Sequence, residues 1–226
     1  MLSYLQEGGG AMEDRQALAC FDFDGTMIRG DSIVSYLKTA RRRGLLSRRG
    51  MASVLWHTIR FFLGLENSDE TKTRALRFRK KLTAEAQESL DREFALQELL
   101  PRIYPGALTQ WKTHQAEGKK MLLVSASTDN YMHWIADALG ADALLCTRLT
   151  PDGRVTGNCK GEEKVRRIRA WLRQEGIGAD WEASFAYGDG KSDLPMLRLA
   201  GHPVQVNPKR KLKKAAPEMA RADWTV

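Results

Sequence analysis

ALACFDFDGT (residues 17–26) combines an apolar run with two acidic residues and a turn. Five apolar residues lead directly into Asp22 and Asp24, and Gly25 and Thr26 follow. Such a run is typical of a buried parallel strand that delivers acidic side chains to its carboxyl edge. Ligands of open α/β sheets bind at that edge. These ten residues therefore predict both an α/β fold and the place of its functional site.

A block with helical periodicity follows this strand. Asp31 is a suitable N-cap, and apolar residues recur at helical spacing up to Gly44, namely Ile33, Val34, Leu37 and Ala40. Further amphipathic stretches lie at 51–64, 71–82 and 84–100. The pattern predicts an all-helical cap over residues 31–103, inserted after the first strand.

The pattern changes to strand–helix alternation after Tyr104. The expected helices lie at 107–117, 129–139, 162–175 and 193–200, and the expected strands lie at 121–126, 143–147, 183–189 and 203–207. Pro151-Asp152-Gly153 predicts the turn of a small hairpin. The predicted fold class is α/β, a Rossmann-like, doubly wound parallel sheet formed by 17–30 and 104–226. Residues 1–16, which contain three consecutive glycines, are interpreted as a flexible leader.

The composition suits one soluble globular protein. Of 226 residues, 42% are hydrophobic and 28% are charged, which argues against a disordered chain or a fibre. Thirty-six Lys and Arg against 28 Asp and Glu give a formal net charge of +8. The excess lies in residues 38–81, where thirteen basic residues stand against three acidic ones. An anionic partner is therefore expected, and charge alone leaves phosphate, nucleic acid and lipid headgroups open.

Cysteine usage and hydropathy indicate the expected compartment. Three widely spaced cysteines without a CxxC pair indicate neither a disulfide framework nor a zinc site, so a cytoplasmic location is expected. The most apolar later stretch, 51–65, is interrupted by His57 and Arg60. It is also shorter than the roughly 20 residues that a membrane-spanning helix needs.

A second pair of acids, Asp189 and Asp193 in YGDGKSD, follows another apolar strand and lies in a glycine-containing turn at a helix start. Acids from the ends of different strands converge around a hard cation such as Mg²⁺, which is the expected cofactor. The first pair, Asp22 and Asp24, suits the roles of nucleophile and proton donor.

Two further residues have similar placements. Ser125 ends the strand MLLVS, where its hydroxyl and the amides that follow can bind a phosphoryl oxygen near a helix N-terminus. Lys164 in CKGEEK opens a helix and can neutralise charge that develops on a phosphoryl group. Lys160, one helical turn earlier, is the alternative; Lys164 is favoured for its place in the helix opening.

These segments resemble, in the same order, the four motifs of the haloacid dehalogenase (HAD) superfamily. The matching elements are DFDGT at 22–26, the strand-final Ser125, the helix-start Lys164 and GDGKSD at 188–193. The chain is most similar to branch IB, which contains the phosphoserine phosphatases and has a helical lid inserted directly after the first motif. The ending VNPKRKLKKAA is also similar to members of that branch, and the resemblance covers 17–226.

The resemblance implies a magnesium-dependent phosphatase that hydrolyses a small organic phosphomonoester, such as phosphoserine, through an aspartyl-phosphate. It implies that Asp22 is the nucleophile and that Asp24 protonates the leaving alcohol and then activates water. It implies that the Mg²⁺ ligands are Asp22, Asp189, the Asp24 backbone carbonyl and Asp193. The residues that it implies for the phosphoryl group are Thr26, Ser125 and Lys164, with Asp31 touching the substrate.

Two departures from that branch concern the substrate. The second motif reads SAST where phosphoserine phosphatases usually show Ser-Gly-Gly, and Gly25 stands where they usually have Ser. These departures leave the specificity for phosphoserine open, whereas the expectation of phosphatase chemistry does not depend on them.

Three alternatives have weaker support. A hydrolytic dehalogenase of the same superfamily needs neither a second acid at the place of Asp24 nor a cation. A lipid-headgroup phosphatase would use the basic segment and VLWHTIRFFLGL (54–65) peripherally at an anionic membrane. A nucleic-acid-binding protein is suggested by the charge and by KRKLKK (209–214), but no nucleic-acid motif accompanies them. A small-molecule phosphate ester is therefore the expected partner, and oligomeric state cannot be read from the sequence.

Overall fold

The computed structural model of the chain describes residues 15–225. Residues 1–14 of the predicted leader lie outside the described residues. The last two residues of the predicted leader, Arg15 and Gln16, instead begin strand β1 (Arg15–Phe21) and pair with Gly178 and Ala179 of β5 (Gly178–Gly188). The strand extends beyond the apolar run because sheet pairing uses backbone groups, whatever the side chain.

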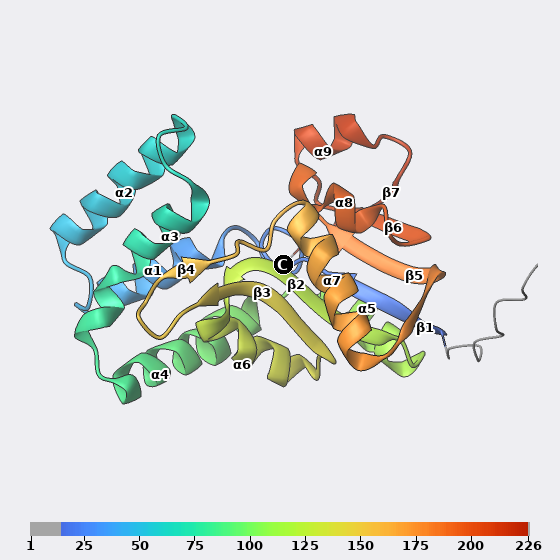
Figure 1. The fold of residues 1–226 in the computed structure, drawn as a ribbon, viewed down its shortest axis with the longest axis horizontal. Helices are drawn as coiled ribbons and strands as arrows, with labels where there is room; N and C mark the ends of the chain where they lie inside the picture. The colour runs from blue at the N-terminus through green and yellow to red at the C-terminus, as the bar shows by residue number, and fades with distance from the viewer. Residues whose placement is uncertain (1–14, 226) are drawn as a thin grey trace, which may run out of the picture.

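Seven strands form one sheet in the order β4-β3-β2-β1-β5-β6-β7 (Figure 1). All neighbouring strands are parallel except β3 and β4, which form the hairpin predicted at Pro151–Gly153. The strands are β1 (Arg15–Phe21), β2 (Lys120–Thr128), β3 (Ala143–Leu149), β4 (Val155–Thr156), β5 (Gly178–Gly188), β6 (His202–Val206) and β7 (Ala220–Ala222). The predicted fold class, a doubly wound and mostly parallel α/β sheet, is confirmed.

Helices cover both faces of the sheet. Alternate residues of β1 point to opposite faces, so Phe21 packs in a cluster with Trp111 and Tyr131, whereas Leu18 packs in a second cluster with Ile168. The helices on the two faces explain why the strands read as continuous apolar runs. They are α5 (Pro105–Ala116), α6 (Asp129–Leu139), α7 (Glu162–Glu175), α8 (Leu194–Leu197) and α9 (Arg210–Ala215).

A helical segment between β1 and α5 lies to one side of the sheet (Figure 1). It falls within the predicted cap, and the division into core and cap stays a prediction. Its helices are α1 (Ser32–Arg42), α2 (Arg48–Phe62), α3 (Ser68–Leu76), the 3₁₀ turn η1 (Arg77–Lys81), α4 (Ala84–Glu93), the π-helical η2 (Phe94–Leu99) and the 3₁₀ turn η3 (Leu100–Arg102). No helix within residues 15–225 is long and apolar enough to cross a bilayer.

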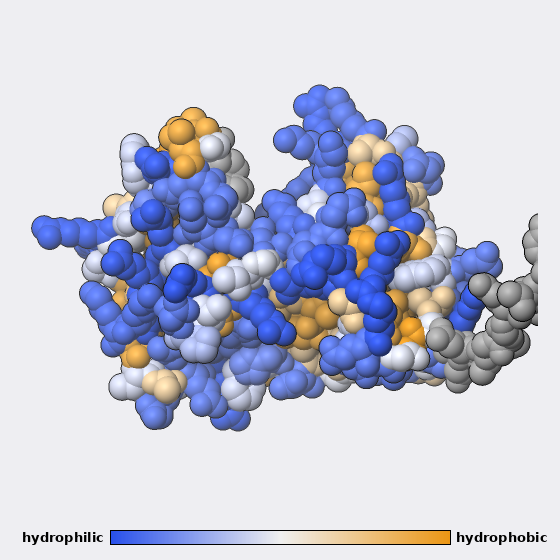
Figure 2. Space-filling view, in the orientation of Figure 1, coloured by the Kyte–Doolittle hydropathy of each residue, from blue (hydrophilic) through white to orange (hydrophobic). Residues whose placement is uncertain are grey.

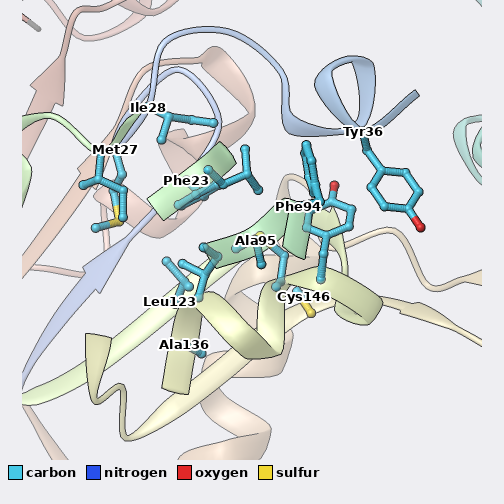
Figure 3. Packing of buried hydrophobic residues seen from close by; sticks show 14 of the residues in the cluster. Phe23, Met27, Ile28, Tyr36, Phe94, Ala95, Leu123, Ala136 and Cys146 are labelled. Atoms are coloured by element: carbon cyan, nitrogen blue, oxygen red, sulfur yellow. The ribbon is translucent and has the colours of Figure 1, made fainter. Parts of the chain in front are cut away.

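Aromatic packing joins this segment to the sheet layer. The rings of Tyr36 in α1 and Phe94 in η2 each lie 5.3 Å from that of Tyr131 in α6, measured between centroids. Figure 3 shows Tyr36 and Phe94 in the same cluster as Phe23, which follows β1, and Leu123 of β2. The position of α1 is thereby fixed next to the loop that carries Asp22 and Asp24.

The predicted helices differ from the observed ones mainly at their ends. The helix predicted at 193–200 is the 3₁₀ turn η4 (Lys191–Asp193) followed by the single turn α8. The helix predicted at 71–82 begins at Ser68, because the Asn67 side chain caps it by accepting from the Glu70 amide at 2.8 Å. Helix α9 was not predicted, because in its basic run only Leu212 is buried and no apolar periodicity marks it. Strand β7 was not predicted either, because it has only three residues and none of them is buried.

Candidate active site

The loop after β1 carries the first pair of acids. Asp22 continues the sheet by donating its amide to the Tyr187 carbonyl at 3.0 Å, and the chain then turns at Gly25, whose φ is +85°. A Cβ at Gly25 would lie 2.1 Å from Oδ2 of Asp189. Glycine at this position therefore serves both the backbone conformation and the close approach of the two acidic loops.

Lys164 and Asp22 form a buried ion pair at the end of β1. The Lys164 ammonium donates to Asp22 Oδ1 at 2.6 Å and to the Val124 carbonyl at 2.9 Å, and it lies 2.8 Å from Asp193 Oδ1. Burial lowers the pKa of Lys164, but the charges of Asp193 and Asp22 outweigh it, so the net pKa is raised and the lysine stays charged. Thr26 donates to Asp22 Oδ2 at 2.8 Å.

Burial and the neighbouring charges also act on the acids. Burial, followed by the charge of Asp193, raises the pKa of Asp22 to about 7. Burial raises the pKa of Asp189 as well, against the effect of Lys209, whose ammonium lies 2.7 Å from Asp189 Oδ2. In both acids burial is the main cause of the raised pKa, and the neighbouring Asp193 charge adds to it.

The site contains a set of ligand atoms suited to a cation. Carboxylate oxygens of three buried residues lie within 4.8 Å of one another, and they belong to Asp22, Asp189 and Asp193. An all-oxygen carboxylate set fits a hard divalent cation such as Mg²⁺. The side chain of Asp24 is directed elsewhere, so only its backbone carbonyl, the group implied by the resemblance, remains available for this cluster.

Asp24 is held by serine residues of α1 and β2. Its Oδ1 accepts from the Ser32 amide at 2.7 Å, and its Oδ2 accepts from the hydroxyls of Ser32, at 3.0 Å, and Ser127. The Ser32 hydroxyl also contacts that of Tyr131 at 3.0 Å. Burial, followed by the charge of Asp31, raises the pKa of Asp24 to about 6, although the serine hydrogen bonds lower it. Ser32 and Tyr131 were not predicted, because neither belongs to a motif.

The remaining predicted residues surround the acids, and they differ in how deeply they are buried. Ser125 is fully buried, and its hydroxyl accepts from the Ser127 amide at 3.0 Å. Asp31 is exposed at the rim, where it caps α1 by accepting from the Val34 amide at 3.0 Å. Lys160 is also exposed at the rim, so the structure brings Lys164, rather than Lys160, to Asp22.

A pocket of about 340 Å³ lies between the acids and the helical segment. Side chains of α1 give it an apolar wall, formed by Ile33, Val34 and Leu37. Lys72 of α3 also lines it, but its ammonium is engaged by the Ala126 carbonyl and Asn158 Oδ1, each at 2.6 Å. Burial lowers the pKa of Lys72, against the charges of Asp31 and Asp24. Neither Lys72 nor Lys209 was singled out from the sequence, because both lie in generally basic segments.

The sequence and fold have known counterparts. The sequence model of the haloacid dehalogenase-like hydrolase family matches residues 19–198. A Mycobacterium tuberculosis protein named a probable phosphatase is 32% identical over 223 residues, covering 93% of this chain and 76% of that protein. A Neisseria meningitidis histidinol-phosphatase is 29% identical over 213 residues, covering 89% of this chain and 95% of that protein. A substrate-bound phosphoserine phosphatase structure gives a TM-score of 0.61 at 25% identity, covering 92% of this chain and 94% of that chain. With the family model spanning most of its length and the family's acids gathered at one sheet edge, this chain belongs to the haloacid dehalogenase-like hydrolase family.

Proposed function

We propose that this protein is a magnesium-dependent phosphomonoesterase that acts on a small organic phosphate through an aspartyl-phosphate. The observation that carries the proposal is the buried Asp22, paired with Lys164 and neighboured by Asp189 and Asp193 at the carboxyl edge of the sheet. A carboxylate beside a fixed cation and a cation site suits attack on phosphorus better than any binding role.

The side chains divide the proposed reaction between them. A carboxylate oxygen of Asp22 forms a bond to phosphorus while the bond to the leaving alcohol breaks, and Asp24 gives that alcohol its proton. Asp24 then takes a proton from water, which attacks phosphorus and releases phosphate and Asp22. Its pKa of about 6 lies near neutrality, as donating and then accepting a proton requires. Thr26, Ser125 and Lys164 orient the phosphoryl group.

The proposed cation site consists of the Asp22, Asp189 and Asp193 carboxylates with the Asp24 backbone carbonyl. A bound Mg²⁺ would polarise the phosphoryl oxygens and offset the charge of the acids. Lys164 and Lys209 hold two of these carboxylates in place through contacts of 2.6 and 2.7 Å.

Ser32 is a positioning residue for Asp24 in this scheme. We expect Ser32→Ala to lower kcat about tenfold, because one hydrogen bond to a charged group, worth roughly 1.5 kcal/mol, is lost while the Ser32 amide contact remains. Steady-state kinetics across pH check this, since a less restrained Asp24 also shifts the pH profile. Ser35→Ala is the matched control, because the Ser35 hydroxyl bonds to the Asp31 carbonyl instead. Equal losses in both variants would contradict the assignment.

The pocket supports one substrate class over another. The α1 wall is apolar, and the buried lysines of the pocket are engaged: Lys72 has two acceptors at 2.6 Å, and Lys164 and Lys209 pair with Asp22 and Asp189. Lys160 lies at the exposed rim. We therefore expect a leaving group that covers the apolar wall to be favoured over one that carries a carboxylate. The relatives are named for both kinds of substrate, histidinol phosphate and phosphoserine. We propose that the substrate resembles histidinol phosphate more closely than phosphoserine.

Phosphate release from a panel of compounds tests the proposal. Purified protein is given p-nitrophenyl phosphate, histidinol phosphate, phosphoserine and a sugar phosphate, each with Mg²⁺ or with EDTA. We expect turnover to need Mg²⁺, and kcat/KM for histidinol phosphate to exceed that for phosphoserine at least about tenfold, because its imidazole ring replaces the carboxylate and can cover the α1 wall. Hydrolysis of none of them would overturn the phosphatase proposal, whereas a preference for phosphoserine would overturn only the choice of substrate.

A further inference from the structure

The exposed apolar side chains of this protein are concentrated on one helix and its following loop. Among the residues whose side-chain exposure the structure describes, which leaves out 58, 61 and 62, five of the six exposed large apolar side chains lie between Leu55 and Leu65. Their exposed fractions range from 43% to 68%. They are Leu55, Trp56, Ile59, Leu63 and Leu65. Figure 2 shows a hydrophobic patch at the tip of the lobe where the α2–α3 loop lies in Figure 1. Clustered apolar exposure of this kind marks an interaction surface.

The helical register of α2 puts these side chains on one stripe. Leu55 and Ile59 lie at i and i+4 of α2 with Trp56 beside them, and Leu63, the residue after the helix end, continues the spacing at i+8; Leu65 follows in the loop. On the same face at the N-terminal end of the helix stand Arg48 and Arg49, both exposed. We call these two arginines and the five apolar residues the α2 surface. It has the arrangement of a helix that lies in a membrane interface, with apolar residues below and basic residues at the headgroups.

Charge decides between the possible occupants of the α2 surface. Residues 38–81 carry a net charge of +10 within a chain of +8, so the remainder is slightly acidic. Two copies joined through α2 would bring two such segments together, which is unfavourable. Arg42 and Arg43 are paired with Glu98 and Glu93, but Arg48 and Arg49 have no ion pair within the described residues.

We propose that the α2 surface docks the protein peripherally on an anionic lipid bilayer, with α2 parallel to the membrane plane. Leu55, Trp56, Ile59 and Leu63 enter the headgroup and acyl boundary, and the Arg48–Arg49 pair contacts anionic headgroups. The opposite face of α2 contributes Val54 to the pocket that contains the catalytic acids. The docked face and the pocket therefore lie on opposite sides of α2. The inference does not depend on the proposed function.

Vesicle sedimentation of the full chain tests the proposal. Vesicles of phosphatidylcholine with 40% phosphatidylglycerol are compared with pure phosphatidylcholine at low and physiological salt. We expect salt-sensitive binding to the anionic vesicles. The double change Arg48→Gln and Arg49→Gln should weaken it about thirtyfold, as expected for the loss of two basic side chains from an anionic surface. Trp56→Ser should weaken it at least about tenfold.

Two controls keep the result interpretable. Lys213→Gln with Lys214→Gln removes the same charge from exposed positions of α9 and should leave vesicle binding within about threefold of the unchanged protein. Circular dichroism and thermal unfolding show that each variant is folded. Absence of binding to anionic vesicles at low salt would overturn the proposal, as would an equal loss in the α9 variant. So would a dimer in sedimentation velocity that Trp56→Ser dissociates.

Discussion

Asp22→Asn is expected to abolish turnover, with kcat for p-nitrophenyl phosphate lowered roughly 10⁴-fold or more, the scale seen when a covalent nucleophile is removed. The amide that this change introduces is uncharged and a far poorer nucleophile, while its size and shape are those of the aspartate it replaces. Asp22 is one of three buried carboxylates within 4.8 Å. Because the change relieves repulsion among them, we expect the metal-free variant to be at least as thermally stable as the unchanged protein.

Asp31→Asn is the matched control for this prediction. It makes the same chemical change in an acid that lies nearby but is exposed at the pocket rim, where its role is to cap α1. We expect it to alter KM more than kcat and to leave most of the turnover intact. If Asp22→Asn kept more than about one hundredth of kcat with Mg²⁺ present, the covalent route through Asp22 would be wrong, whatever the effect of Asp31→Asn.

The parts of the fold that could be predicted have strong local causes. Helices α6 and α7 were predicted with the bounds that the structure has, because each is closed by a left-handed glycine, Gly140 with φ of +63° and Gly176 with φ of +66°. The central strands β1, β2, β3, β5 and β6 were recognised because both faces of the sheet are covered there and the strands contain continuous apolar runs, whereas the exposed edge strand β7 has no such run. The helix predicted over 84–100 is α-helical only up to Glu93 and continues as the π-helical η2 and the 3₁₀ turn η3. Pro101 explains why the helix ends there, because proline lacks the amide that an α-helix requires.

The site was predictable where its residues follow strands, and it was not where they meet only through tertiary packing. Asp22 and Asp189 stand directly after apolar runs, so the edge of the sheet places them. The contact of Asp24 with Ser127 joins residues 103 positions apart, and that of Ser32 with Tyr131 spans 99. No local spacing encodes such pairs, because the first depends on how β1 and β2 align in the sheet and the second on how α1 docks against α6. The exposure of the α2 surface could likewise not be predicted from the sequence, since the same apolar periodicity is typical of a helix whose apolar face is buried.

Lys164→Met is expected to destabilise the metal-free protein by about 3–5 kcal/mol, the cost of leaving buried charges without their partner. The Lys164 side chain is 1% exposed, and its ammonium lies within 2.8 Å of oxygens of both Asp22 and Asp193. Methionine fills a similar volume but supplies no charge. Urea unfolding in EDTA measures the loss. Turnover should fall as well, because the phosphoryl group loses its fixed cation.

The pH dependence of that loss separates a charge effect from a packing effect. Because burial and the charge of Asp193 raise the pKa of Asp22 to about 7, the folded state holds this proton more tightly than the unfolded state, and stability falls as pH rises from about 4 to 7. Without Lys164 the pKa rises further, so the deficit should be small near pH 5 and largest near pH 8. Lys160→Met makes the same change at an exposed lysine that precedes α7 and should cost less than about 0.5 kcal/mol at any pH. A deficit in Lys164→Met that did not change with pH would indicate lost packing and would remove the argument that Lys164 neutralises the acids.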